Sequence, residues 1–159
     1  KYAPFKFVII PGNHDATRTF YLGEFLKALY RNNENVEVDN SPRARKYLKW
    51  GNNLIGYTHG HEEVKGSLPV LMPQEVPNLF AEAEFKEWHT GHLHSYSERN
   101  AHYIKDSFGI RIMVLPSLVP LDDWHSKKGY WHMREALAIE YDWEHGRISD
   151  HHYHPGITG

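Results

Sequence analysis

The 159-residue sequence contains no cysteine, which excludes disulfide bonds and thiolate metal sites. A reducing compartment fits this absence. No apolar run approaches the roughly 18 residues that a membrane-spanning helix requires, and no signal peptide is visible. We therefore predict a cytoplasmic protein with no membrane contact.

Excess positive charge is also lacking, because the formal net charge is −2. A broad basic surface for duplex DNA is therefore not expected. A local basic patch exists at Arg43, Arg45, Lys46 and Lys49, and we favour a solvent-exposed strand face over a nucleic-acid surface as its interpretation. The composition, 40% hydrophobic and 14% aromatic, is typical of one globular domain, which we place at residues 1–159.

The abundant residue type is histidine, which occurs 13 times. Histidine is the commonest metal ligand and exchanges protons near neutral pH. The histidines of the C-terminal HHYH stretch are expected to be exposed. The informative ones lie in three short motifs, which are GNHD at 12–15, THGHE at 58–62 and GHLH at 91–94.

Hydrophobic periodicity predicts an α/β fold in which each of these motifs follows a strand. A buried strand is expected at 5–10, a helix at 17–32 capped by Asp15 or Thr17, and a short strand at 36–39. Three hairpins are also expected, formed by residues 44–50 with 53–58, 98–105 with 109–115, and 135–143 with 147–152.

The connections between these elements are expected to be less regular. Residues 67–79 contain several prolines and predict an irregular loop, and residues 78–88 predict a short helix. Residues 116–131 are rich in aromatic side chains and are expected to form a loop.

Strands of one sheet would bring the three motifs to one edge of that sheet. His92 and His94 are separated by one residue, and in an extended segment alternate side chains point the same way, so both can face one site. His59 and His61 repeat this spacing around Gly60, so that one can bind a metal while the other supports it. For each pair alone, two solvent-facing histidines remain the alternative.

The GNHD motif carries three different chemical functions in a row. The side-chain oxygen of Asn13 is a neutral, hard metal ligand. His14 can point elsewhere and act as an acid or a hydrogen-bond donor, and Asp15 can hold its tautomer. The alternative interpretation is a simple turn that caps a helix.

The ordered set GNHD, HGH and GHLH resembles the second half of the calcineurin-like metallophosphoesterase family. That family includes protein phosphatases, cyclic-nucleotide phosphodiesterases and break-repair nucleases. The resemblance extends roughly over residues 5–120 and implies the C-terminal part of a four-layer α/β/β/α sandwich, with two metals at the strand ends. The run PSLVPLDDWHSKKGYW is similar to a branch found in phage and mobile-element genomes.

The resemblance implies a two-metal phosphoester hydrolase and gives each motif residue a role. His14 would be the catalytic histidine that contacts the leaving oxygen, and Asp15 would orient it. Metal ligands would be Asn13, His59 and His92 for the second metal and His94 for the first, with His61 as the less favoured alternative to His59. Mn²⁺ is the expected metal, with Fe or Zn²⁺ as alternatives.

The chain departs from the family in one respect. The family's first half carries Asp-x-His and Gly-Asp-x-x-Asp motifs, which supply the bridging aspartate and most ligands of the first metal, and neither occurs here. We therefore interpret the chain as a C-terminal portion that binds metal weakly or at partial occupancy and hydrolyses little by itself. An exposed sheet could make it a homodimer. The alternative is a degenerate half-domain that acts as a non-catalytic interaction module.

The substrate is left open between two classes. A nuclease would bind DNA through the basic patch, whereas a phosphodiesterase or phosphomonoesterase would act on nucleotides or other small esters. Aromatic residues could line a groove for bases, although we favour a packing role for this set: Tyr96, Trp124, His125, Tyr130 and Trp131.

Overall fold

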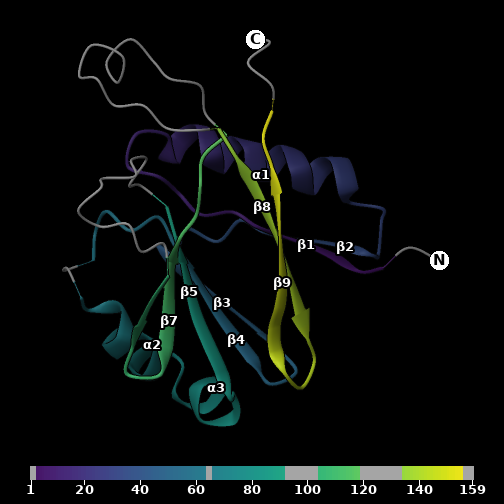
Figure 1. Ribbon diagram of the computed structural model, residues 1–159. Helices are drawn as coiled ribbons and strands as arrows, with labels where there is room; N and C mark the ends of the chain where they lie inside the picture. Colours follow the sequence, from purple (N-terminus) through teal and green to yellow (C-terminus); the bar gives the residue numbers. More distant parts are fainter. Residues whose placement is uncertain (1–2, 64–65, 92–103, 119–133, 156–159) are drawn as a thin grey trace.

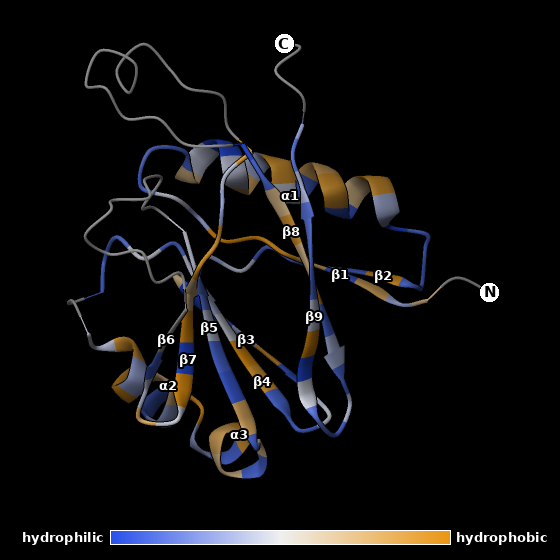
Figure 2. Ribbon diagram, viewed as in Figure 1, coloured by the Kyte–Doolittle hydropathy of each residue, from blue (hydrophilic) through white to orange (hydrophobic). Residues whose placement is uncertain are grey.

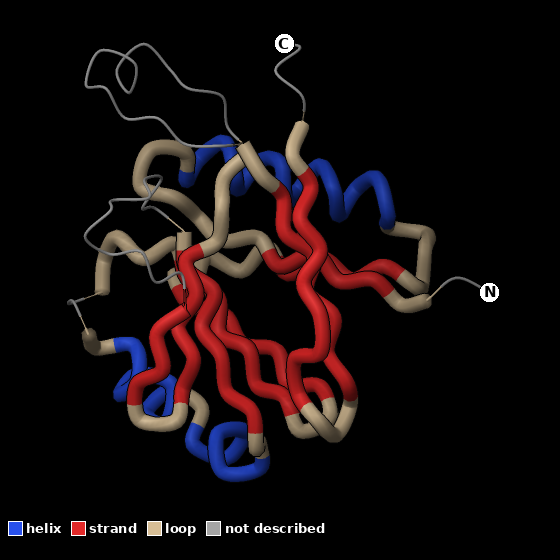
Figure 3. The backbone as a smooth tube through the Cα atoms, viewed as in Figure 1, coloured by secondary structure: helices blue, strands red, loops and turns tan. Residues whose placement is uncertain are grey.

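The structure, a computed structural model, describes residues 3–63, 66–91, 104–118 and 134–155, which form a mixed α/β fold (Figure 1). Its helices are α1 (Ala16–Tyr30), α2 (Leu68–Glu75) and α3 (Pro77–Glu82). Its strands are β1 (Phe5–Val8), β2 (Val36–Asp39), β3 (Arg45–Trp50), β4 (Asn53–Thr58), β5 (Phe85–Thr90), β6 (Ile104–Ser107), β7 (Ile110–Val114), β8 (Ala136–Asp142) and β9 (Gly146–Tyr153). Figure 3 shows how the helices lie around the strands.

A five-stranded sheet with the strand order β3-β4-β5-β7-β6 is the largest unit among the described residues. Strands β4, β5 and β7 run parallel, so their carboxyl ends meet at one edge of the sheet, which we call the motif edge. Thr58 at the end of β4 pairs with Thr90 at the end of β5. The predicted position of the THGHE and GHLH motifs directly after strands is therefore confirmed. The expectation that one sheet carries all three motifs is wrong, because GNHD follows β1 of a separate two-stranded sheet.

The two faces of β5 have different partners because its side chains alternate. Trp88 is fully buried, and its Nε1 donates to the carbonyl of Leu68 in α2 at 2.9 Å. Together with Leu54 and Met72 it forms a core between the sheet and the short helices. A Cβ at Gly56 would lie 2.6 Å from the Trp88 ring, so the close approach of the indole requires glycine on β4.

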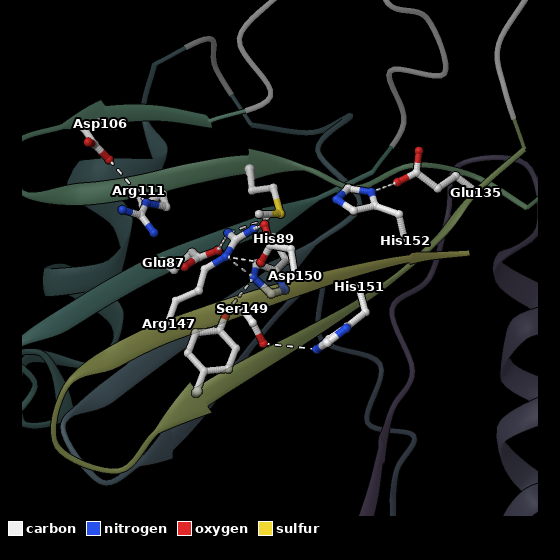
Figure 4. Close-up of polar contacts among 12 residues, drawn as sticks. Glu87, His89, Asp106, Arg111, Glu135, Arg147, Ser149, Asp150, His151 and His152 are labelled. Carbon is white, nitrogen blue, oxygen red and sulfur yellow. Dashed lines mark hydrogen bonds and ion pairs between the residues drawn. The ribbon is translucent and has the colours of Figure 1, made fainter. Parts of the chain in front are cut away.

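The opposite face of β5 carries Glu87 and His89, which meet the β8–β9 hairpin (Figure 4). Arg147 Nη1 donates to Glu87 Oε1 at 2.8 Å, and both side chains are more than 90% buried. His89 Nε2 lies 3.1 Å from Glu87 Oε1 and 3.1 Å from the hydroxyl of Tyr141. Arg147 also forms an ion pair with Asp150. The hairpin is therefore joined to the sheet by a buried polar cluster.

A second, two-stranded sheet pairs β1 and β2 in parallel and lies beside α1. Helix and strand are joined by Asn40, whose Nδ2 donates to the Phe20 carbonyl and to Glu24 Oε1, both at 2.9 Å. The two sheets are joined by Lys46 of β3, whose buried Nζ donates to the carbonyl of Asp39 at 2.8 Å and to its Oδ1 at 3.1 Å.

The three hairpin predictions hold for the described residues. β3 pairs with β4, β6 with β7, and β8 with β9, each antiparallel. Residues 98–103 of the predicted second hairpin lie outside the described residues. The short strand predicted at 36–39 is also confirmed.

The predicted loop at 67–79 is wrong, because α2 and α3 occupy most of it. Pro69 and Pro77 lie in the first turns of these helices, where a backbone N–H has no intrahelical acceptor and its loss costs nothing. The helix predicted at 78–88 is also wrong in its second half, since α3 ends at Glu82 and Trp88 lies in a strand.

The burial expected for the first strand and the first helix is only partly found. Phe5 is 54% exposed and β1 ends at Val8. In α1 the buried residue is Gly23, and Leu26 and Tyr30 are half-buried. The other large apolar side chains are 47–66% exposed; they are Phe20, Tyr21, Leu22, Phe25 and Leu29. Residues 20 and 22 lie about 200° apart around a helix, so one contact face cannot bury both. In Figure 2 the hydrophobic residues of α1 are coloured orange.

Candidate functional site

The GNHD motif forms the turn between β1 and α1. Asp15 stands at the N-cap of α1, but it makes no side-chain capping bond there, and its Oδ1 accepts the backbone N–H of Gly12 at 3.1 Å instead. A Cβ at Gly12 would lie 2.4 Å from that carboxylate oxygen, so a larger residue there would displace the Asp15 side chain. Asn13 and His14 are exposed at the tip of this turn.

The decisive contact joins this turn to the end of β4. His59 Nε2 lies 3.0 Å from Asn13 Oδ1, although the two residues are 46 positions apart in the sequence. The imidazole nitrogen and the amide oxygen thus face each other, as expected for two residues predicted to bind one metal. Gly60 has a φ of 91°, a conformation that turns the chain sharply after His59.

The third motif begins beside the second. Gly91 N donates to the His59 carbonyl at 3.1 Å, a bond that follows from the parallel register of Thr58 with Thr90. A Cβ at Gly91 would lie 3.5 Å from His59 Nδ1. The predicted ligands His92 and His94 lie outside the described residues.

His61 lies close to His59 but has a different neighbour. The two ring centroids are 5.0 Å apart, and His61 Nε2 lies 3.5 Å from Glu62 Oε1. The described contact with Asn13 is made by His59. The preference for His59 over His61 as a metal ligand stays a prediction. The role of Asp15 in orienting His14 stays a prediction, because its described contact is with Gly12.

A cavity of about 470 Å³ opens beside the Asn13–His59 contact. This volume is in the usual range for a small-molecule site. The cavity is lined by both motifs, by the first turns of α1 and by the segment after β2, namely Ile9, Pro11, Gly12, Asn13, Ala16, Thr19, Phe20, Asn40, Ser41, Pro42, Ala44, Thr58, His59, His61, Glu62 and Glu63. Within the described residues, no group of three or more His, Asp, Glu or Cys side chains is placed to hold a metal ion.

Three of the four residues of the basic patch, Arg45, Lys46 and Lys49, make contacts within the fold. Arg45 pairs with Glu63 and Glu75, and Lys46 is buried against Asp39. Lys49 Nζ donates to the Gly51 carbonyl at 2.6 Å. The interpretation of these residues as a solvent-exposed strand face is therefore wrong for Lys46, whose side chain is 2% exposed. Burial of an ammonium group is tolerated here because it has an anionic partner.

Sequence reasoning missed two buried polar residues at this cavity. Glu63 follows the THGHE motif directly, and Asn40 follows the last residue of β2. The position of Glu63 beside a histidine motif was a usable signal. Nothing in the sequence marks Asn40, because its role depends on the approach of α1.

The Asp39–Lys46 contact predicts a loss of stability in acid. Burial alone would raise the pKa of Asp39, but hydrogen bonds from Ser41 and Lys46 outweigh it and lower the pKa to about 2. A carboxyl with a pKa below its unfolded value of 3.8 stabilises the fold above that pH. We therefore expect the free energy of unfolding to fall between about pH 4 and pH 2, and to fall less in Asp39→Asn. Urea unfolding at a series of pH values measures this, and an equal slope for both proteins would contradict it.

Comparison of the chain with protein-family models, with curated proteins and with solved structures found no match. Among the helices that the structure describes, none is long and apolar enough to cross a membrane.

Proposed function

We propose that this chain carries the Asn-His side of the metal centre of a metal-dependent phosphoester hydrolase of the calcineurin-like kind. One observation carries the proposal. Asn13 and His59 come from different sheets, and their ligand atoms lie 3.0 Å apart. Two residues that the motifs assign to one metal are therefore neighbours in the fold.

The donor chemistry fits a divalent transition metal. A neutral imidazole nitrogen together with an amide oxygen suits Mn²⁺, Fe²⁺ or Zn²⁺. Asn13 and His59 would hold the ion, and the motifs add His92 and His94. When bound, such ions neutralise phosphate oxygens and make hydroxide available near neutral pH.

His14 is the residue of this chain that would move a proton. It follows Asn13 directly and is exposed at the tip of the turn, so a substrate beside the metal centre is within its reach. It would donate a proton or a hydrogen bond to the leaving oxygen, as a general acid does. The turn is held in place by the Gly12–Asp15 bond.

The arrangement of layers also supports this proposal. Helix α1 lies along the two-stranded sheet, and α2 and α3 pack on one face of the five-stranded sheet. The β8–β9 hairpin covers the opposite face of that sheet. Helices outside and strands inside are what the α/β/β/α sandwich requires.

A small phosphoester is the substrate class that we favour. Arg45 and Lys46 are held by carboxylates, which removes half of the proposed DNA-binding patch. Duplex binding depends on several cations free to contact phosphates. The volume of the cavity, about 470 Å³, instead suits a nucleotide or another small ester.

The test of the proposal is metal binding by the 159-residue chain. Calorimetric titration with Mn²⁺ should show binding that weakens by about tenfold or more in His59→Ala, because even supporting groups of metal sites typically contribute about 10–100-fold. His145→Ala is the matched control, since that side chain is 79% exposed and its described contact is with Asp142 in its own hairpin turn. Equal Mn²⁺ affinity of wild type and His59→Ala would refute the assignment.

The exposed side chains of α1 favour a second candidate, a non-catalytic interaction module. Phe25 and Leu29 are 61% and 58% exposed, which is unusual for neighbouring apolar residues on a helix. A module of this kind would not bind Mn²⁺ at Asn13. The homodimer predicted from an exposed sheet is a separate proposal, and light scattering on the eluting protein tests it.

A further inference from the structure

We propose that Glu63 is a positioning residue that fixes His59 beside Asn13. This inference rests on the proposed function, because the purpose of the positioning is metal binding. In this proposal Glu63 does not bind the metal itself. It acts through the turn that carries His59.

The first observation is the closure of that turn by a side-chain bond. Thr58 Oγ1 donates to Glu63 Oε1 at 2.6 Å, and Thr58 is the last residue of β4. The bond joins the two ends of the segment that contains His59 and His61. With both ends held, the imidazole of His59 has fewer positions available to it.

The second observation is the anchoring of Glu63 to the rest of the fold. Arg45 Nη1 donates to Glu63 Oε1 at 3.2 Å, and its Nε donates to Glu75 Oε1 of α2 at 2.7 Å. Tyr47 donates to the other oxygen of Glu75 at 2.7 Å. The turn is thereby connected to β3 and to α2, which are rigid elements rather than loops.

The third observation is the cost of placing a carboxylate there. The Glu63 side chain is 4% exposed, and its Oε2 is buried with no hydrogen-bond partner among the described residues. A buried carboxylate with one unsatisfied oxygen is costly when its only purpose is stability. Burial raises its pKa, but hydrogen bonds from Thr58, its own backbone and Arg45 lower it, so Glu63 is ionised at neutral pH.

The neighbouring Glu62 provides a matched control. It lines the same cavity and carries the same charge, but its side chain is 59% exposed and its contact is with His61. Glu62→Ala therefore removes an equal charge without opening the turn. Any difference between the two substitutions reports position rather than charge.

The experiment compares Mn²⁺ affinity and stability in the same proteins. We expect Glu63→Ala to weaken Mn²⁺ binding by about 10–100-fold, as supporting residues of metal sites do. Glu63→Gln retains an acceptor for Thr58 and should restore part of that loss, whereas Glu62→Ala should stay within about twofold of wild type. Thr58→Val removes the same hydrogen bond but leaves the Glu63–Arg45 contact in place. It is used instead of Glu63→Ala if that variant does not fold.

Two results would overturn the inference. One is wild-type Mn²⁺ affinity in Glu63→Ala or Thr58→Val despite a lower unfolding midpoint, which would leave Glu63 a purely structural role. The other is an equal loss in Glu62→Ala, which would make the effect one of charge.

A metal-free readout separates this inference from the proposed function. The imidazole cross-peaks of His59 at fixed pH should shift in Glu63→Ala and not in Glu62→Ala. If wild type binds no Mn²⁺, the proposed function fails, and these cross-peaks alone decide whether Glu63 positions His59.

Discussion

Replacing His14 by alanine is expected to slow Mn²⁺-dependent hydrolysis of a phosphodiester by about 10²–10⁴-fold, the usual contribution of a positioned general acid. The reason is geometric. His14 stands exposed beside Asn13, whose side-chain oxygen meets His59. The rate is measured with the protein expressed from its complete reading frame, on single-stranded DNA, duplex DNA and small esters in parallel.

Metal content must be measured on the same His14→Ala protein. We expect it to be unchanged, because His14 is not among the proposed ligands, which are Asn13, His59, His92 and His94. His145→Ala again serves as the control for losing an exposed imidazole. Equal rates for wild type and His14→Ala would remove the catalytic assignment, and a parallel loss of metal would make His14 a ligand.

Replacing Glu87 by alanine is expected to lower the free energy of unfolding by about 3–5 kcal/mol. The substitution leaves Arg147 of β9 buried between the hairpin and the sheet without the partner that lies 2.8 Å away. It also removes a neighbour of His89 in the cluster of Figure 4. Asp150, the remaining partner of Arg147, is more exposed and compensates for only part of the loss.

Urea unfolding measures this effect, and an exposed pair supplies the control. Arg111 and Asp106 lie 3.7 Å apart, and the Asp106 side chain is 73% exposed. Asp106→Ala is expected to change the free energy of unfolding by less than about 1 kcal/mol, as exposed pairs do. A similar small change in Glu87→Ala would mean that the hairpin does not depend on the buried pair.

Local sequence signals correctly predicted an element where its hydrophobic pattern and its flanking turn residues indicated the same boundaries. Turn residues between two strands predicted the β3–β4 hairpin around Gly51, which adopts the left-handed conformation that glycine favours. Prolines misled the prediction at α2 and α3, since the same residue that breaks a helix interior is favoured in a first turn. Position within the helix accounts for Pro69 and Pro77, whereas Pro73 lies inside α2 and is tolerated there.

Burial was less predictable than secondary structure. A strand of alternating residues such as β5 has two faces, but its sequence does not say which face meets helices and which meets another hairpin. Glu87 is charged but only 5% exposed, because its partner Arg147, 60 positions away in the sequence, reaches it on folding. Lys46 shows the same effect with Asp39.

By itself, the sequence determined the chemistry that the three short motifs offer, which is an amide oxygen, imidazoles and a carboxylate on segments that follow strands. The order of these side chains within each motif is local, and local backbone geometry is what a short motif can encode. Only the tertiary structure decided that Asn13 meets His59 rather than His61, and that Glu63 and Arg45 hold the turn behind it. These contacts join residues from separate strands and loops, and their distances follow from the parallel register and from the packing of the sheets, which no single segment contains.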